Sequence, residues 1–308
     1  MITEWFDGKD NYMKKTFEKD PQGKKHKFTV EVLEQEVPEN RHLNEILQDH
    51  VSHRQTKTVE VLYSGGVDSE AVLNSLHVSG VPIKAITMRL LVRGCAINTH
   101  DLYYSEKFCR QRGINQKIVE LDAKTFYESG KFLDYTAPYS IPSPHCGSYF
   151  WLFEQTTGFP VNGGDYFWPW TYGPNHMENK IISPSRYDYA CNQLFLRDRG
   201  IDGIGDMLKW SLEGNIHMMK AHIAAMDSGT FYGLYDFKKK MHSILGFEDC
   251  EQRTQNYGYN YVSKSMLDID RIKEENTIKN GDVESVIVWK KQIADILGGV
   301  PGSNDKYR

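Results

Sequence analysis

The sequence of 308 residues lacks the features of a membrane protein, a basic nucleic-acid binder or a disulfide scaffold. Its longest uncharged stretch, residues 135–153, contains three prolines and many polar residues, unlike a membrane span. Its formal net charge is −4, so no overall basic field attracts nucleic acid. Its cysteines are odd in number and include no CxxC pair: Cys95, Cys109, Cys146, Cys191 and Cys250.

The N-terminus also lacks a signal-peptide pattern, because its opening, MITEWFDGKD, is polar and acidic. Together with the unpaired cysteines, this predicts a cytoplasmic protein with reduced thiols and no membrane partner. Hydrophobic residues make up 40% of the chain and charged residues 25%, which is ordinary for a globular protein. The length allows one large domain or two modest ones.

Strand and helix patterns alternate with short links over residues 58–170. Apolar, β-favouring segments predict strands at 58–63, 81–92 and 114–122 and from 158 onward. Helical patterns fill the gaps at 69–80, 100–113 and 148–155. This alternation predicts an α/β fold with a doubly wound parallel sheet of four or five strands.

The two flanking regions have a different texture. The first is a polar N-terminal extension with a strand at 26–37 and a helix at 40–51. The region from residue 175 onward is predicted to be mainly helical, with its clearest helices at 205–226 and 283–297. We therefore expect three parts: 1–57, 58–174 and 175–308.

The turn after the first predicted strand reads SGGVDS, residues 64–69, and contains no lysine. It therefore fits neither the GxxxxGK[ST] phosphate loop nor the GxGxxG dinucleotide loop. Gly65 and Gly66 still allow consecutive backbone N–H groups to converge. Ser64 and Ser69 add hydroxyl donors, and the N-terminus of the following helix favours negative charge. The turn therefore predicts an anion site.

Asp68 is the unexpected member of this turn. A carboxylate beside a phosphate is repelled unless a cation stands between them. The residue therefore predicts a Mg²⁺ ion that bridges Asp68 and phosphate oxygens.

The string SGGVDS directly after a strand resembles the fingerprint of the PP-loop ATP pyrophosphatases, SGGxDS. The similarity covers about residues 58–170 and includes EKFCRQRGINQKIVELD at 106–122. The resemblance implies that Ser64, Gly65, Gly66, Val67, Asp68 and Ser69 bind the phosphates of ATP with Mg²⁺. Asp68, Ser64 and Ser69 would then be the catalytic residues.

The resemblance also implies a reaction. A substrate carbonyl or carboxyl oxygen attacks the α-phosphate, pyrophosphate leaves, and ammonia, an amine or sulfur then attacks the adenylated carbon. The nearest subfamily stays open between asparagine synthetase and the 7-cyano-7-deazaguanine synthases. The four-cysteine zinc site of the latter is missing. No cysteine follows Met1 as a glutaminase nucleophile, so ammonia would be free or come from a partner chain.

Further site residues follow from the same resemblance. Met88 ends the second strand, where the family places adenine, although a core methionine is an equal reading. Gly163 and Gly164 match a later nucleotide-binding loop, and Asp165 would be a second Mg²⁺ ligand, with an ordinary turn as the alternative. Arg89 and Arg93 could neutralise phosphate or be surface charges. Arg186, Lys209 and Lys220 could also reach the pyrophosphate, and no spacing argument selects one of them; Arg186 is kept as a substrate-binding candidate.

A Pro-rich loop before the helix at 148–155 contains His145 and Cys146. The tRNA thiolases of the family have a catalytic cysteine in a similar loop, and a protonated His145 would lower the pKa of Cys146. Both residues are therefore substrate-site candidates, and Cys191 is a weaker partner cysteine. Aromatic residues after the last strand could stack on a planar substrate or close the core: Tyr166, Phe167, Trp168 and Trp170.

Three functions stay open at this point. The favoured one is an ATP-dependent adenylating ligase that acts on a small molecule or nucleobase. A sulfur transferase that uses Cys146, with tRNA as a less favoured partner, is the second. A non-catalytic nucleotide-binding protein is the third, and a homo-oligomer stays open for all three.

Overall fold

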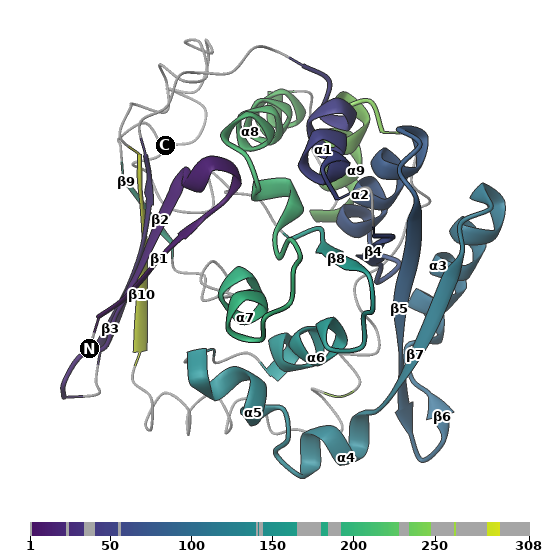
Figure 1. Cartoon of the computed structure of the whole chain (residues 1–308), viewed down its shortest axis with the longest axis horizontal. Coiled ribbons are helices and arrows are strands. Elements are labelled where there is room, and N and C mark those ends of the chain that lie inside the picture. The colour runs from purple at the N-terminus through teal and green to yellow at the C-terminus, as the bar shows by residue number, and fades with distance from the viewer. Residues whose placement is uncertain are drawn as a thin grey trace.

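The structure is a computed structural model in which two β-sheets flank a group of helices (Figure 1). It describes residues 2–22, 25–33, 41–54, 57–139, 141, 144–164, 180–183, 192–227, 234–247, 262 and 282–289.

Four parallel strands form the sheet at the right of Figure 1. They are β4 (Val59–Leu62), β5 (Ile83–Val92), β7 (Gln116–Asp122) and β8 (Phe159–Asn162). Their order is β7-β5-β4-β8, with every pairing parallel. The prediction of an α/β fold with a parallel sheet is confirmed. A short strand, β6 (Cys95–Ala96), folds back antiparallel on the end of β5.

Helices cover both faces of this parallel sheet. One face packs on α2 (Val67–Val78) and α3 (Thr99–Arg112), through a cluster that contains Val61, Leu73 and Cys109. The other face packs on a cluster that contains Leu62, Ile86 and Phe150. This second cluster is covered by α4 (Ala123–Glu128), α5 (Leu133–Thr136), η2 (Ala137–Tyr139) and α6 (Pro144–Phe153).

The strand order has a functional consequence. The chain moves outward from β4 to β5 and β7, and then returns to the other side of β4 as β8. The connections therefore diverge between β4 and β8. In open α/β sheets, ligands bind at this topological switch point, beyond the carboxyl ends of the strands. The turn at 64–69 and the glycines at 163–164 both lie there.

The second sheet joins the two ends of the chain. Its order is β1-β2-β3-β10-β9, and β3 pairs with β10 in parallel. The strands are β1 (Ile2–Asp7), β2 (Met13–Glu18), β3 (Lys25–Val32), β10 (Asp282–Trp289) and β9 (Lys180–Ser183). The sequence predicted only β3 among the N-terminal strands. The division at residues 57 and 174 stays a prediction.

The helix predicted at 283–297 is wrong over its first part, because Asp282–Trp289 is the strand β10. Its segment VESVIVW is rich in β-branched residues, which favour strands. It pairs in register with β3 over eight residues, and a short apolar run of this kind fits a helix or a strand equally well. The described part after residue 175 is therefore not purely helical.

The remaining helices lie between the sheets and above the parallel one (Figure 1). The helix predicted at 205–226 is a 3-10 turn, η3, followed by α8. None of the described helices is both long and apolar enough to span a membrane. Their bounds are α1 (Leu43–Ser52), α7 (Asn192–Asp198), η3 (Met207–Lys209), α8 (Leu212–Asp227) and α9 (Leu234–Ile244), and η1 (Lys9–Asn11) links β1 to β2.

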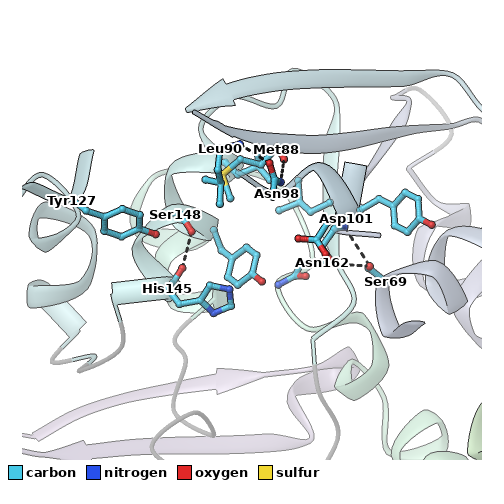
Figure 2. Close-up of a pocket in the computed structure, with 14 residues that line it drawn as sticks. Ser69, Met88, Leu90, Asn98, Asp101, Tyr127, His145, Ser148 and Asn162 are labelled. Carbon is cyan, nitrogen blue, oxygen red and sulfur yellow. Dashed lines mark hydrogen bonds between the residues drawn. The ribbon is translucent and has the colours of Figure 1, made fainter. Parts of the chain in front are cut away.

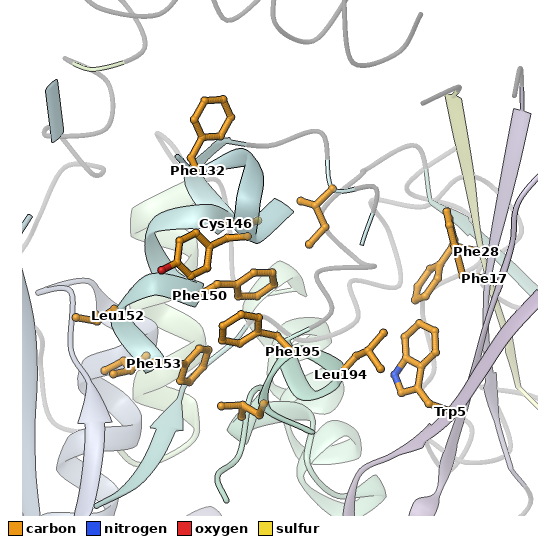
Figure 3. Close-up of a cluster of buried hydrophobic side chains, with 14 of the residues drawn as sticks. Trp5, Phe17, Phe28, Phe132, Cys146, Phe150, Leu152, Phe153, Leu194 and Phe195 are labelled. Atoms are coloured by element: carbon orange, nitrogen blue, oxygen red, sulfur yellow. The ribbon is translucent and has the colours of Figure 1, made fainter. Parts of the chain in front are cut away.

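One hydrophobic cluster connects the two sheets (Figure 3). At its centre, the rings of Phe150 and Phe195 stack 4.5 Å apart with an interplanar angle of 6°. Leu194 extends the cluster to Trp5 and Phe28 on the N-terminal sheet. Helix α7 therefore packs between the N-terminal strands and the parallel sheet.

Candidate functional site

A pocket opens at the carboxyl ends of β4, β5 and β8 (Figure 2). Its volume of about 80 Å³ is below the roughly 300–1,000 Å³ of a whole small-molecule site, so it accommodates one part of a ligand. Its lining is Leu62, Tyr63, Ser64, Ser69, Met88, Leu90, Asn98, Asp101, Tyr127, His145, Ser148, Tyr149, Leu152 and Asn162.

The turn at 64–69 lies at one end of this pocket. Gly66 is the N-cap of α2, and no described side chain caps the helix. The hydroxyls of Ser64 and Ser69 lie 3.2 Å apart, and Ser69 Oγ donates to the backbone oxygen of Gly66 at 3.0 Å. Val67 is the first residue of α2 and is buried in the core. The two hydroxyls and the first turn of a helix thus meet at one point, as an anion site requires.

Gly65 allows the close packing of the turn on one side, and Gly163 lies in ordinary contact with it on the other. Gly65 has φ +80°, and a Cβ built on it would lie 2.5 Å from the backbone oxygen of Asp101. Only a residue without a side chain fits there. On the other side, a Cβ on Gly163 would lie 3.4 Å from the backbone oxygen of Asp68. The turn is therefore held between the start of α3 and the end of β8.

Asp68 makes two side-chain contacts with α9. Lys238 Nζ lies 2.6 Å from its Oδ2, and His242 Nε2 lies 3.1 Å from its Oδ1. Burial by itself raises the pKa of Asp68, but the charge of Lys238 and the hydrogen bond from His242 outweigh it and hold the pKa well below its usual range. The carboxylate is therefore ionised at neutral pH, and an ammonium group stands beside the turn.

Sequence reasoning missed Lys238 because 170 residues separate it from Asp68. It belongs to the run Lys238-Lys239-Lys240, which reads as a solvated surface. The available signal was that three consecutive residues on a helix point in three different directions around its axis, so they do not all face the same surface. Lys238 is only 9% exposed, while Lys240 is exposed. One lysine of the three therefore faces inward.

Met88, in the second half of β5, lines the pocket, and its role in binding adenine stays a prediction. Its backbone oxygen accepts from Asn98 Nδ2 at 2.8 Å, and Asn98 Oδ1 accepts from the backbone N–H of Leu90 at 2.9 Å. Beyond the end of β4, the Asn98 amide thus makes the hydrogen bonds to β5 that the backbone of a neighbouring strand would otherwise make. It fixes the upper wall of the pocket (Figure 2).

One face of helix α6 lines the pocket, and another face packs in the hydrophobic core. His145, Ser148, Tyr149 and Leu152 line the pocket at the spacing of one helix face. Cys146 is on the other side, buried among apolar side chains that include Phe150. Of the two predicted residues in this loop, only His145 therefore lines the pocket.

His145 does not provide the positive charge that the sequence reading required. Burial lowers its pKa to about 4, so the imidazole is neutral at pH 7. Its ring meets the ring of Tyr149 edge to face, with centroids 4.4 Å apart. A neutral His145 does not activate the Cys146 thiol by charge. It offers a ring nitrogen and an aromatic edge to a pocket ligand.

The other predicted residues have varied placements. Arg89 pairs with Glu120 at 2.9 Å, and Arg93 lies at φ +52° in the turn between β5 and β6, so neither lines the pocket. Gly164 follows β8 with φ +66° and packs against Asp206. The remaining predicted residues lie outside the described residues: Asp165, Arg186, Cys191, Tyr166, Phe167, Trp168 and Trp170.

Within the described ranges, no group of three or more His, Cys, Asp or Glu side chains could hold a metal ion. This does not bear on Mg²⁺ bound with phosphate, because such an ion uses one or two carboxylates, with phosphate oxygens and water as its other ligands. Asp68, Ser64 and Ser69 supply oxygen atoms of the type that Mg²⁺ prefers.

No protein-family model matches the chain, and no curated protein matches it. Among solved structures, the U34-tRNA thiolase NcsA from Methanococcus maripaludis with its [4Fe-4S] cluster is similar at a TM-score of 0.28 and 13% identity, over 77% of this chain and 76% of that one. The NMN synthetase from Francisella tularensis is similar at a TM-score of 0.29 and 10% identity, over 78% and 96%. Similarities this remote carry no conclusion about function.

Gly65→Ala tests the packing of the turn. We expect it to lower the free energy of unfolding in urea by about 1–3 kcal/mol more than Gly80→Ala does, because its methyl group would collide with backbone. Gly80 is a matched control, since its φ is +74° and a Cβ there meets no described atom within 4 Å. Equal losses for the two variants would contradict the close packing of the turn.

Proposed function

We propose that the protein is an ATP pyrophosphatase-type enzyme that adenylates a carbonyl or carboxyl oxygen of its substrate. The oxygen attacks the α-phosphorus of ATP, the bond to the β-phosphate breaks, and pyrophosphate leaves with the bonding electrons. Ammonia or an amine then displaces AMP from the activated carbon. The observation that carries this proposal is the junction of the SGGVDS turn, the α2 N-terminus and the Lys238 ammonium group at the switch point of the sheet.

The pocket and the turn suit different parts of ATP. The pocket wall is apolar at Leu62, Met88 and Leu90, and Tyr127 and Tyr149 add aromatic surface. A nucleobase fits such surroundings. The turn at the pocket's end provides hydroxyls and the positive end of a helix dipole, which suit phosphates. The base would then lie against β5 and the phosphates against α2.

Lys238 would neutralise the leaving pyrophosphate. Charge that develops on a leaving group is stabilised by a cation already held in place. Asp68 holds the ammonium group beside the turn before any ligand arrives. The lysine that the turn lacks in its own sequence would thus come from α9.

The donor set fits a Mg²⁺ ion that arrives with ATP. Asp68 would hold it, with Asp165 as a second candidate ligand. The ion would supply Lewis-acid stabilisation of the phosphate charges. Binding at Asp68 would also leave the Lys238 ammonium group to pair with phosphate oxygens.

Sulfur transfer is the alternative reaction of the same adenylated intermediate. It needs a thiolate that reaches the substrate. Cys146 is only 7% exposed, packs in the hydrophobic cluster and does not line the pocket. This placement favours amidation over a Cys146-dependent sulfur transfer. It leaves open a purely nucleotide-binding role, which an assay for products decides.

Product analysis with Asp68→Asn tests the proposed reaction. We expect the full chain, incubated with ATP, Mg²⁺ and pools of candidate acceptors, to form AMP and pyrophosphate. The isosteric variant should lose at least about 100-fold in rate, because it removes the charge that holds Lys238 and the metal. ADP and phosphate as products, or full activity of the variant, would refute the proposal.

Cys146→Ser separates amidation from sulfur transfer. If the enzyme is an adenylating ligase, the rate of AMP formation should stay within about twofold, because the thiol is in the core and the substitution is small. Phe150→Leu, a change in the same cluster, controls for effects of core packing. Loss of product with unchanged stability in Cys146→Ser would favour the sulfur transferase.

A further inference from the structure

A second group of buried polar residues lies between the N-terminal sheet and the segment after β8. It contains the side chains of four charged residues, each of which is less than a tenth exposed as a whole residue: Asp7, Lys15, Asp206 and Lys209. Asp7 and Lys15 come from β1 and β2, Asp206 directly precedes η3, and Lys209 is the last residue of η3. Charged groups are seldom buried so deeply unless they are paired or bind something. These four side chains are called the inner charge cluster below.

The two halves of the inner charge cluster are each paired. Lys15 Nζ lies 2.5 Å from Asp7 Oδ2, and Lys209 Nζ lies 3.9 Å from Asp206 Oδ1, which also accepts from Asn192 Nδ2 at 3.0 Å. Burial raises the pKa of Asp206, while the charges of Lys209 and Lys15 oppose the rise. Two positive and two negative groups thus give the cluster a formal charge of zero.

Pairing is incomplete around this cluster. Among the described residues, three buried polar atoms have no hydrogen-bond partner: Asp7 Oδ1, Trp5 Nε1 and Asn215 Oδ1. Asp7 is 4% exposed, Trp5 3% and Asn215 0%. Buried polar atoms in native proteins nearly always have partners, so this donor and these two acceptors are available for hydrogen bonds with a polar ligand.

Backbone contacts connect the inner charge cluster to the turn at 64–69. Gly163 packs against the backbone of Asp68 and Ser69. Its neighbour Gly164 packs against Asp206, where an added Cβ would lie 2.5 Å from Oδ1. Two consecutive residues therefore separate the turn from the inner charge cluster. A molecule held by the cluster would lie beside bound ATP.

We propose that the inner charge cluster binds the acceptor of the reaction, and that the acceptor is a zwitterionic small molecule of the amino-acid type. This assignment rests on the proposed adenylation. Asp7 and Asp206 suit an ammonium group, and Lys15 and Lys209 suit a carboxylate. A ligand with both charges leaves the buried cluster neutral, whereas a singly charged ligand would leave a net charge away from water. The N-terminal strands would then determine substrate specificity.

A purely structural role of the Asp7–Lys15 pair would give a different result when the pair is replaced. Other contacts already hold the N-terminal sheet against η3 and α8. Tyr12 Oη donates to the backbone oxygen of Lys209 and accepts from Asn215 Nδ2. If the Asp7–Lys15 pair only adds to this docking, its replacement by neutral side chains of similar volume should be harmless, as is common for buried pairs. If it binds the acceptor, the same change should remove acceptor binding.

The test compares the double variant Asp7→Asn/Lys15→Met with the wild-type chain in thermal unfolding. We expect at least one of the free amino acids to raise the melting temperature of the wild type. The variant should lose that shift, keep the shift caused by ATP with Mg²⁺, and show a KM for the amino acid raised at least about tenfold with little change in the KM for ATP.

Glu4→Gln/Lys14→Met is the matched control, because this pair joins the same two strands on their exposed side at 2.7 Å. Should Asp7→Asn/Lys15→Met fail to fold, Asp206→Asn/Lys209→Met tests the cluster from its other side. No shift with any amino acid, a shift that survives in both variants, or stimulation of AMP formation by nucleobases alone would overturn the proposal. The last result would leave the adenylation itself standing, and an absence of AMP with every acceptor would contradict the adenylation instead.

Discussion

The ion pair between Asp68 and Lys238 brings a cation to the SGGVDS turn, which has none in its own sequence. The Asp68 carboxylate at the start of α2 would repel phosphate if it stood alone. With the ammonium group 2.6 Å away, the local charge is balanced before a ligand binds. Under the proposed function, an incoming phosphate or Mg²⁺ would exchange partners within an existing ionic arrangement and would not have to bury a new charge.

The rest of the fold places the Asp68–Lys238 pair at the topological switch point of the parallel sheet. The order β7-β5-β4-β8 puts the turn and Gly163 on either side of the switch point, and the missing side chain of Gly65 lets the backbone at the start of α3 approach the turn. Helix α6 closes the pocket with one face and anchors itself in the core with the other. Through Phe150 and Phe195, the same core extends to the N-terminal strands, so the inner charge cluster is held in a fixed position relative to the turn.

Local patterns in the sequence were sufficient to predict the parallel sheet and the turn. SGGVDS carries its conformation in two glycines and its polarity in two serines, and the strands beside it are apolar throughout. The strand at 282–289 was mistaken for a helix because its partner, β3, is some 250 residues away in the chain and a short apolar run has no distinctive period. Lys238 was missed for a related reason, since the contact that draws it inward joins distant segments. On α6, the sequence singled out Cys146 for its chemistry, whereas helix geometry turned the neighbouring His145 toward the pocket and the thiol toward the core.

The affinity for inorganic pyrophosphate shows whether Lys238 acts as the cation of the turn. Titration calorimetry with Mg²⁺ should show binding by the wild-type chain, and Lys238→Met should weaken it about 10- to 100-fold, the value of a charge-assisted hydrogen bond. Lys240→Met, an exposed lysine on the same helix, should bind like the wild type. Equal affinity of Lys238→Met and the wild type, or no binding of pyrophosphate at all, would show that Lys238 and the turn do not hold the leaving pyrophosphate.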